Sequence, residues 1–365
     1  MKKINKICIL GDAMIPSSMF QAGYQQFLSP YVKEAKFGEW ESDWQKLQYR
    51  RLEVEKRGPE IESVPEMILA EGKDSEIAIG LFAPMSSKLM DAMPNLKIIG
   101  VCRAGLENVN VEEATRRGIL VFNVKGRNAE AVSDFTVGMM LSEARNIARA
   151  HYAIKTGTWR KTFSNSDSVI ELKNKTIGLV GFGFIGQLVA EKLSGFKPNI
   201  VVYDPFITKE FADSKGVGIV DKEELFRISD IVTVHARLTD ETKGMVDKKC
   251  IDSMKKTAYF LNTARAGLVD YKALVEALKE KRIAGAAIDV FETEPLPSDD
   301  GLLSLDNVTL TTHIAGTTSE ALSNSPGLLM EDIKKMLLRK NPAYLVNPEV
   351  LENPSFNEWF SSRTL

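Results

Sequence analysis

At 365 residues the chain is too long for one ordinary core and predicts two domains of roughly 100–200 residues each. Hydrophobic residues (44%) and charged residues (26%) stand in the balance of a globular protein, which excludes a disordered or low-complexity chain. The formal net charge of −2, with both signs interspersed, excludes a nucleic-acid surface, and no apolar stretch approaches the ~20 residues of a membrane span.

Short apolar runs alternate with helical stretches from end to end, which predicts an α/β fold with parallel sheets. The first run follows a basic opening like that of a signal peptide. Its apolar part is only four residues and runs into Gly11 and Asp12, so we expect a first β-strand instead. The expected strands are residues 4–10, 77–82, 98–101, 119–123, 177–180, 200–203, 231–235, 258–262, 286–290 and 308–311.

The expected strands form two groups, separated by one long predicted helix over residues 129–156. The polar stretch 157–174 is expected to be a surface connection into the second sheet, which begins near Thr176. Residues 319–338 predict a further helix, which is too short to be a domain and should pack back on the first one. Two doubly wound units joined by a helix are the simplest architecture.

The three cysteines, Cys8, Cys102 and Cys250, are widely separated and show no spacing typical of metal ligands. We expect buried thiols in a reducing cytoplasm, and no metal site.

Gly181, Gly183 and Gly186 form a G-x-G-x-x-G motif at the end of an apolar strand, and residues 187–193 continue as an amphipathic helix. In this context the glycines permit a tight turn, backbone approach to a pyrophosphate and close helix–strand packing, while the helix N-terminus offers free N–H groups. The motif therefore predicts a dinucleotide site. The alternative is a turn with spare glycines.

The next strand ends at Asp204, 18 residues beyond Gly186, where a carboxylate can accept hydrogen bonds from the adenosine ribose. The same charge would repel a 2′-phosphate, which favours NAD over NADP. The alternative is a turn residue before Pro205.

The chain has only three histidines that could act as a general acid or base near neutral pH. His151 falls in the long helix and is expected at a surface or interface. His235 ends a strand, where a place in the cofactor wall is favoured over proton transfer. His313 follows the strand at residues 308–312, at a carboxyl edge where such sheets bind ligands.

Arg265 and Glu294 follow two other expected strands, so their side chains could face the same crevice as His313. Oxidation of a hydroxyl by hydride loss needs a base, which the imidazole of His313 can provide, and Glu294 would fix its tautomer. The guanidinium of Arg265 could grip carboxylate and carbonyl oxygens and stabilise oxyanion charge. The alternative is a structural ion-pair network at a domain face.

With these residues in place, the chain resembles the D-isomer-specific 2-hydroxyacid dehydrogenases, a group that includes D-3-phosphoglycerate dehydrogenase, glyoxylate reductase, D-lactate dehydrogenase and formate dehydrogenase. The resemblance covers about residues 96–316. Its landmarks are Gly-Phe-Gly-Phe-Ile-Gly at 181–186, Asn-Thr-Ala-Arg-Ala-Gly-Leu-Val-Asp at 262–270, Gly-Ala-Ala-Ile-Asp-Val-Phe-Glu-Thr-Glu-Pro at 285–295 and Thr-Thr-His-Ile-Ala-Gly at 311–316.

The resemblance implies an NAD-dependent oxidoreductase that transfers a hydride between nicotinamide and a D-2-hydroxy or 2-oxo acid. It implies a Rossmann NAD-binding domain (residues 123–316) inserted in a discontinuous, flavodoxin-like substrate domain (residues 1–122 and 317–365). The helix at 129–156 would belong to a homodimer interface.

The resemblance also implies the site residues. Arg265, Glu294 and His313 form the catalytic set, Asp289 contacts the nicotinamide carboxamide, and Thr263 and Ala264 line the nicotinamide. The full expected cofactor set is Gly181, Gly183, Phe184, Ile185, Gly186, Asp204, His235, Ala236, Thr263, Ala264, Arg265, Asp289, His313 and Ala315. The expected substrate set is Arg103, Ala104, Gly105, Arg265 and His313, where the segment 101–105 would offer backbone N–H groups to the substrate carboxylate.

Three features depart from the common family pattern or leave the substrate open. The loop from Arg103 to Val109 is about two residues shorter than the usual glycine-rich version. Arg237 stands where proline is common, and it could touch a cofactor phosphate or point to solvent. Lys125 and Arg127 could meet a distal phosphate or second carboxylate on the substrate, or could be solvated charges at a helix N-terminus.

A reading from a different class is an NAD(H)-sensing interaction protein, because the family includes transcriptional corepressors on the same scaffold. The near-neutral charge and the lack of partner-binding tails favour an enzyme. Only 52 residues follow His313 in the 365-residue chain, so we expect no added regulatory domain.

Overall fold

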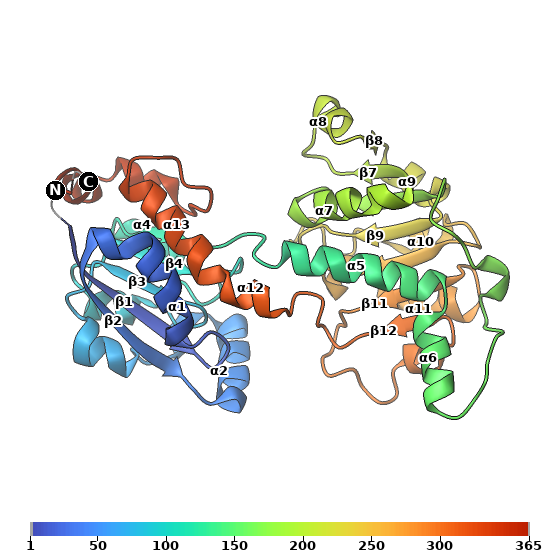
Figure 1. Cartoon of the computed structure of the whole chain (residues 1–365), viewed down its shortest axis with the longest axis horizontal. Helices are drawn as coiled ribbons and strands as arrows, with labels where there is room; N and C mark the ends of the chain where they lie inside the picture. Colours follow the sequence, from blue (N-terminus) through green and yellow to red (C-terminus); the bar gives the residue numbers. More distant parts are fainter. Residues whose placement is uncertain (1–2, 364–365) are drawn as a thin grey trace. The chain divides into compact units, whose positions relative to one another are not determined.

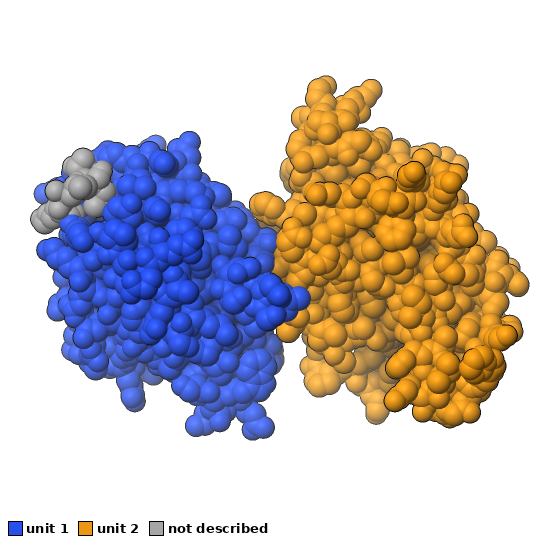
Figure 2. Space-filling model, viewed as in Figure 1, with its two compact units in different colours: residues 1–127, 318–365 blue, residues 128–317 orange. Residues whose placement is uncertain are grey.

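The computed structural model describes residues 3–363 and consists of two compact units, drawn as a cartoon in Figure 1 and in separate colours in Figure 2. Unit 1 combines Met1–Arg127 with Thr318–Leu365, and unit 2 is Asn128–Thr317. The divisions fall after Arg127 and Thr317, whereas the sequence analysis placed them after residues 122 and 316. Segments from both ends of the chain thus build unit 1.

Unit 1 contains a five-stranded parallel sheet in the order β2-β1-β3-β4-β5. This is the flavodoxin-like order 2-1-3-4-5, and the predicted fold class is confirmed. The strands are β1 (Ile4–Asp12), β2 (Val32–Glu41), β3 (Ile77–Gly80), β4 (Ile98–Val101) and β5 (Leu120–Phe122).

Strand β2 was not predicted from the sequence. It is an edge strand that pairs only with β1, and most of its side chains are not fully buried. Its mixed composition, Val-Lys-Glu-Ala-Lys-Phe-Gly-Glu-Trp-Glu, therefore lacks the continuous apolar run of a central parallel strand.

The helices of unit 1 include α1 and α13, which pack together over the sheet. A Cβ at Gly23 would lie 3.1 Å from the backbone of Gly327, and one at Gly100 on β4 would lie 3.0 Å from Leu329. The helices are α1 (Ser17–Gly23), α2 (Trp44–Arg57), α3 (Ser87–Ala92), α4 (Val111–Arg116), α12 (Ser319–Ser323), α13 (Ser325–Leu337) and α14 (Pro354–Ser361), with π-helical turns at Tyr24–Leu28 and Ile68–Gly72.

The single helix predicted for residues 319–338 is wrong in detail, because it is divided into α12 and α13 at Asn324. Pro326 stands in the first turn of α13, where a missing N–H costs nothing, whereas within a continuous helix it would remove a hydrogen bond.

Unit 2 contains a seven-stranded parallel sheet in the order β12-β11-β10-β9-β6-β7-β8. Counted within the unit, its first six strands follow the Rossmann order 3-2-1-4-5-6, with β12 added at one edge. The strands are β6 (Thr176–Val180), β7 (Asn199–Tyr203), β8 (Gly218–Ile219), β9 (Ile231–Val234), β10 (Tyr259–Asn262), β11 (Gly285–Ile288) and β12 (Val308–Leu310); the two-residue β8 was not predicted.

Helices cover both faces of this sheet. Alternate residues of each strand point to opposite faces, so neighbouring residues of one strand pack against different helices. Val232 and Phe260 pack with the helices α9, α10 and α11, while Ile231 and Leu261 pack with α5 and α7. The helices are α5 (Ala129–Ala144), α6 (Ile147–Lys155), α7 (Phe184–Leu193), α8 (Lys209–Ser214), α9 (Lys222–Ile228), α10 (Lys248–Asp252) and α11 (Tyr271–Lys279).

The long helix predicted for residues 129–156 is two helices, α5 and α6. The break falls at Asn146, whose backbone is left-handed with φ 57°. Asparagine tolerates this conformation better than most residues, and its Oδ1 accepts a hydrogen bond of 2.7 Å from Arg149 Nη1. The apolar pattern of the sequence continues across Asn146, so that pattern could not reveal the break.

All three cysteines are free and buried, as expected. Among residues 3–363, no helix is long and apolar enough to cross a membrane.

Candidate active site

The turn between β6 and α7 is built by the three glycines. Gly181 has φ +96°, and a Cβ there would lie 2.7 Å from Ala236 N. A Cβ at Gly186 would lie 2.5 Å from Gly181 O, whereas a Cβ at Gly183 would meet nothing within 4 Å. Two glycines are therefore required by packing, and the third leaves open space beside the backbone.

Helix α7 begins at Phe184, and among the described residues no side chain caps its N-terminus. Its first-turn N–H groups and the positive end of its dipole are thus available to an anion. With the space beside Gly183, this end of α7 fits a pyrophosphate.

Asp204 links this turn to the one that follows β7. Its Oδ2 accepts a hydrogen bond of 2.7 Å from Phe182 N, and its Oδ1 accepts one of 2.9 Å from Phe206 N. The carboxylate is thus both a turn residue and a fixed acceptor, because each oxygen keeps a second lone pair.

His235 follows β9, and its backbone carbonyl carbon would be 2.8 Å from a Cβ at Gly181. Burial lowers the pKa of its ring to about 3, and its Nε2 lies 3.1 Å from Thr233 Oγ1. A ring that stays neutral near neutral pH suits a wall of the site and not proton transfer.

The segment after β10 carries Thr263, Ala264 and Arg265, and Asn262 holds it in place. The buried Asn262 side chain accepts a hydrogen bond of 3.0 Å from Ala264 N and donates one of 3.0 Å to Arg265 O. Arg265 is exposed, and its Nη1 donates to Ala264 O at 2.7 Å. The sequence analysis did not identify Asn262 as a site residue. The one feature that could have indicated it is an amide side chain at the end of a strand.

Asp289 follows β11 and is fully buried. Its Oδ1 accepts hydrogen bonds from Thr311 Oγ1 (2.7 Å) and Ile314 N (3.0 Å), and its Oδ2 accepts one from Ala315 N (2.9 Å). Asp289 therefore fixes the turn after β12 from both sides of His313, whose backbone is left-handed with φ 57°.

His313 and Glu294 are in direct contact. Nδ1 of the ring lies 2.8 and 3.0 Å from the two carboxylate oxygens, one of which also accepts a bond of 3.1 Å from Phe291 N. The two side chains are 42% and 39% exposed, so a small molecule can reach this pair. Arg265, Glu294 and His313 follow β10, β11 and β12, which are adjacent strands with a common carboxyl edge. Within this set of three residues, the hydrogen-bond contact in the described structure joins Glu294 and His313.

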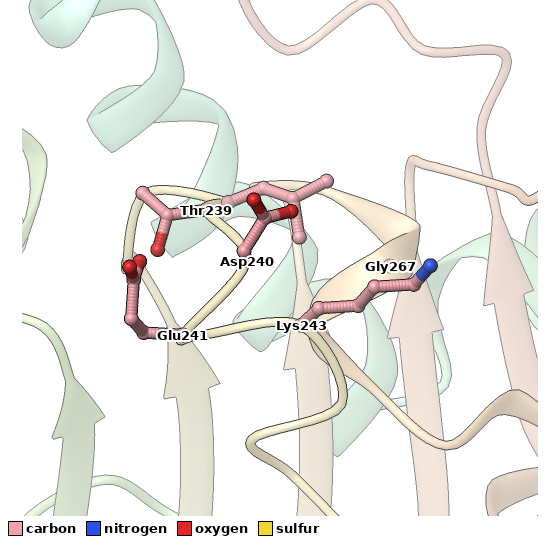
Figure 3. Close-up of a pocket in the computed structure, with 6 residues that line it drawn as sticks. Thr239, Asp240, Glu241, Lys243 and Gly267 are labelled. Atoms are coloured by element: carbon pink, nitrogen blue, oxygen red, sulfur yellow. The ribbon is translucent and has the colours of Figure 1, made fainter.

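A hollow of about 540 Å³ lies beside this edge, between the loop after β9 and the turn at Ala266–Leu268. It is lined by Leu238, Thr239, Asp240, Glu241, Lys243 and Gly267, five of which are labelled in Figure 3. None of the expected site residues lines it, although Gly267 is two residues from Arg265.

In unit 1, Arg103 is held by ion pairs to Glu55 of α2 (2.9 Å) and to Glu107 (3.0 Å), and its guanidinium lies 4.8 Å from the centroid of the Phe82 ring. Ala104 O accepts a hydrogen bond of 2.7 Å from Asn123, and Gly105 lies against Glu107. The ion pair between Arg103 and Glu107 thus lies within the loop at residues 103–109.

The other basic residues that the sequence analysis singled out differ in exposure. Arg127 donates to Ala321 O at 3.2 Å, and burial lowers its pKa. Lys125, Arg237 and His151 are exposed.

Comparisons with known proteins identify relatives of this chain. A family model described as "D-isomer specific 2-hydroxyacid dehydrogenase, NAD binding domain" matches residues 137–315. A glyoxylate reductase of Thermofilum pendens is 43% identical over 272 residues, which cover 73% of this chain and 80% of the relative. A D-3-phosphoglycerate dehydrogenase of Methanocaldococcus jannaschii is 41% identical over 285 residues, covering 77% of this chain and 53% of the relative, so the chain spans about half the length of that protein.

Solved structures share the fold. A D-mandelate dehydrogenase of Rhodotorula graminis, in its holo form, has a TM-score of 0.71 at 26% identity and covers 95% of this chain and 98% of its own. An NAD-complexed D-isomer specific 2-hydroxyacid dehydrogenase of Lactobacillus delbrueckii ssp. bulgaricus has a TM-score of 0.72 at 24% identity, covering 93% of this chain and all of its own.

Proposed function

The chain belongs to the D-isomer specific 2-hydroxyacid dehydrogenase family, and we therefore propose that it is an NAD-dependent oxidoreductase acting on a D-2-hydroxy or 2-oxo acid. The observation that carries this proposal is the contact between His313 Nδ1 and the Glu294 carboxylate at 2.8 Å, on an exposed carboxyl edge of a Rossmann sheet.

His313 exchanges the substrate proton through Nε2, the ring nitrogen that Glu294 leaves free. In oxidation the neutral ring takes the hydroxyl proton, and in reduction the protonated ring returns it to the carbonyl oxygen. Glu294 fixes the tautomer and stabilises the positive charge that develops on the ring. Arg265 binds the substrate carboxylate and the oxygen on C2 through its planar guanidinium, and so orients the reacting carbon.

The residues after β6 fit NAD, which when bound supplies the hydride acceptor or donor. Gly183 and the uncapped N-terminus of α7 would receive the pyrophosphate. Asp204 would accept hydrogen bonds from the ribose hydroxyls, through the lone pairs that Phe182 N and Phe206 N leave free. Its charge disfavours a 2′-phosphate, so NAD is preferred over NADP. The remaining cofactor contacts that we propose are Gly181, Phe184, Ile185, Gly186, His235, Ala236, Thr263, Ala264, Asp289 and Ala315.

We assign substrate binding to the domain formed by residues 1–122 and 317–365, with Arg103, Ala104 and Gly105 as contacts, and NAD binding to residues 123–316. A phosphorylated or doubly charged acid is favoured by Arg127, a half-buried guanidinium for which the described residues offer a carbonyl and no carboxylate within 4.0 Å. Arg51 on α2 also lies outside any ion pair of the described residues and stacks 5.6 Å from the Phe82 ring centroid.

The first test measures NADH oxidation with glyoxylate, pyruvate, hydroxypyruvate, 3-phosphohydroxypyruvate and longer 2-oxo acids. His313→Ala is expected to abolish turnover, and His151→Ala, at an exposed histidine on α6, to retain it. If the wild-type protein binds NADH tightly and reduces none of these acids, the proposed dehydrogenase activity is wrong. The alternative hypothesis, a protein that senses NAD(H), would then be favoured.

The substrate class has its own test. Arg127→Gln is expected to lower kcat/KM at least about tenfold more on phosphorylated than on plain 2-oxo acids, because a charged hydrogen bond is lost. Arg116→Gln, at an exposed arginine of the same unit, is the control. Equal losses of kcat/KM on both classes of acid would contradict the proposal that Arg127 binds a second anionic group of the substrate.

We further propose a cytoplasmic homodimer that contacts its second copy through residues 129–156. Three apolar side chains on α6 support this, because Ile147, Tyr152 and Ile154 are 56–70% exposed.

A further inference from the structure

One face of α5 contacts three threonines within or just after the strands β10 and β12 of the unit 2 sheet. Thr136, Met139 and Glu143 are spaced by three and four residues and so lie on one side of the helix. Their partners are Thr263, which follows β10, Thr311, which follows β12, and Thr309 within β12. The sequence analysis assigned α5 only to a dimer interface.

The contact between Thr136 and Thr263 is buried and joins two hydroxyls at 2.8 Å. Thr136 Oγ1 donates its single proton to Val132 O at 2.7 Å. Because a hydroxyl has one donor, the proton between the two threonines must come from Thr263. Thr263 therefore has its proton committed to α5, and its oxygen can meet any other group only as an acceptor, through its two lone pairs.

Glu143 anchors the other end of this face. It is fully buried, accepts a hydrogen bond of 2.6 Å from Thr309 Oγ1 and pairs with Arg149 Nη2 at 2.5 Å. A Cβ at Gly285 on β11 would lie 2.2 Å from Glu143 Oε1, so the sheet leaves room for this carboxylate.

Between these two ends, Thr311 connects α5 to the turn that carries His313. Its hydroxyl lies 4.0 Å from Met139 Sδ and donates to Asp289, which in turn accepts the N–H groups of Ile314 and Ala315. One helix face thus supports both the segment at Thr263 and the turn at His313.

We propose that Thr136 is a positioning residue, which fixes the Thr263 hydroxyl as an acceptor facing the nicotinamide and so aligns the ring for hydride transfer. The inference rests on the proposed function, because it uses the assignment of Thr263 to the nicotinamide wall. A carboxamide N–H₂ is the donor that such an acceptor recognises. Loss of the Thr136 hydroxyl releases the Thr263 proton and turns this acceptor into a donor of free orientation.

The test compares Thr136→Val, which keeps the shape and removes the hydroxyl, with Thr136→Ser, which keeps the hydroxyl. Thr136→Val is expected to lower kcat about fivefold to tenfold, the effect of one hydrogen bond, and to raise the primary isotope effect with 4-deuterated NADH. The Kd for NADH and the KM for the acid should stay within about twofold. Thr136→Ser should restore both kcat and the isotope effect.

Ser214→Ala is the control, because the Ser214 hydroxyl on α8 also donates to the backbone of its own helix (Phe211 O, 2.7 Å) but is exposed and lies outside residues 129–156. Wild-type kcat and isotope effect in Thr136→Val would overturn the proposal. So would equal losses in Thr136→Val and Thr136→Ser, since the hydroxyl would then not be responsible.

A readout without turnover separates this inference from the proposed function. The emission of protein-bound NADH reports the surroundings of its nicotinamide, and Thr136→Val should shift it while Thr136→Ser and Ser214→Ala do not. If the wild-type protein reduces no 2-oxo acid, the proposed function fails, but this spectral comparison still decides the role of Thr136. Identical spectra in all variants would overturn that role.

Discussion

At the scale of single residues, several acids and amides of unit 2 hold backbone in place and thereby aim other groups. Asp204 ties the glycine turn to the end of β7, Asn262 holds the segment with Arg265, and Asp289 fixes the turn with His313. Each of these side chains is buried or half-buried and accepts N–H groups that would otherwise lack partners. Glu294 and His313, by contrast, are 39% and 42% exposed, which leaves them open to a substrate.

His235 gives a prediction about stability and pH at this scale. Its pKa is lowered by burial from 6.5 to about 3, so below pH 6.5 the unfolded chain binds a proton that the folded chain does not. The stability that this residue contributes is complete above pH 6.5 and is lost as the pH falls toward 3. His235→Asn is expected to reduce the slope of the unfolding free energy by up to about 1.4 kcal/mol per pH unit in that window.

Urea unfolding of the wild type and of His235→Asn at pH 7, 6 and 5 measures this slope, with His151→Asn at the exposed histidine as the control. Parallel slopes in the wild type and His235→Asn would contradict the prediction.

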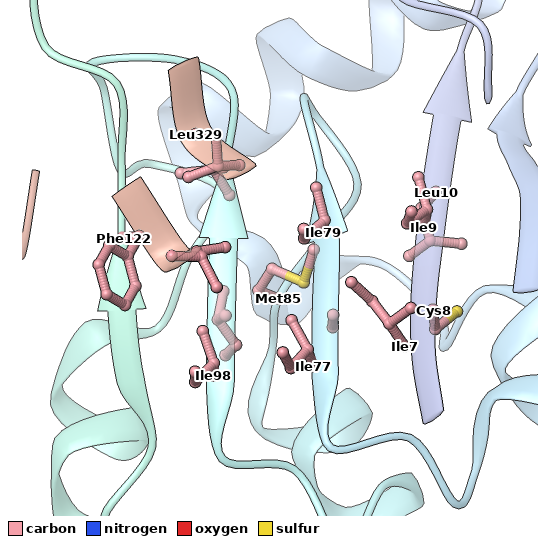
Figure 4. Packing of buried hydrophobic residues seen from close by; sticks show 14 of the residues in the cluster. Ile7, Cys8, Ile9, Leu10, Ile77, Ile79, Met85, Ile98, Phe122 and Leu329 are labelled. Carbon is pink, nitrogen blue, oxygen red and sulfur yellow. The ribbon is translucent and has the colours of Figure 1, made fainter. Parts of the chain in front are cut away.

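At the scale of elements, strands were predicted well where both faces are buried. Ile77 and Ile98 are paired across β3 and β4, and Leu329 of α13 lies over the same sheet (Figure 4). Their apolar runs are continuous because neither face meets water. The edge strand β2 has no such pattern and was not predicted. No change of pattern marks the break between α5 and α6, so the two were predicted as one helix.

The turn from β6 to α7 gives a prediction at the scale of an element. Gly183→Ala should leave the thermal midpoint within about 2 °C, because the added Cβ meets no atom within 4 Å, yet weaken NADH binding about tenfold or more by filling the space for the pyrophosphate. Gly181→Ala should instead unfold the turn, because its φ is +96° and its Cβ would lie 2.7 Å from Ala236 N.

Differential scanning fluorimetry and titration with NADH separate the two variants. If Gly183→Ala lost as much thermal stability as Gly181→Ala, or bound NADH as the wild type does, the proposed place of the pyrophosphate would be wrong.

At the scale of the whole molecule, the chain divides into two α/β units with different strand orders, and one unit is made from both ends of the chain. The catalytic set that we propose lies entirely in unit 2, whereas Arg51, Arg103 and Arg127, which we associate with the substrate, belong to unit 1. The matched family model covers residues 137–315, within unit 2, whereas the 272-residue match to the glyoxylate reductase is longer than unit 2 alone.

The proposed homodimer is the prediction at this scale. Tyr152 and Ile154 on α6 are 70% and 59% exposed, and burying them against a second copy would remove apolar surface from water. The double variant Tyr152→Asp, Ile154→Asp should therefore shift the protein from dimer to monomer, because a charge in such an interface is costly. Light scattering after size exclusion measures the mass directly.

Phe206→Asp is the control for this experiment, since Phe206 is 93% exposed in the same unit but lies outside residues 129–156. A wild-type protein that runs as a monomer, or a double variant that stays dimeric, would rule out this interface.

The sequence by itself determined the fold class, the glycine turn, and the order in which Arg265, Glu294 and His313 follow their strands, because the carboxyl ends of parallel strands share one edge whatever the details of packing. Only the tertiary structure decided which side chains meet. Thr136 and Thr263 are 127 residues apart, and Glu143 and Thr309 are 166 apart, so no local pattern could pair them. Such contacts depend on the side to which a helix turns each residue and on its distance from the sheet, and packing of the whole unit sets both.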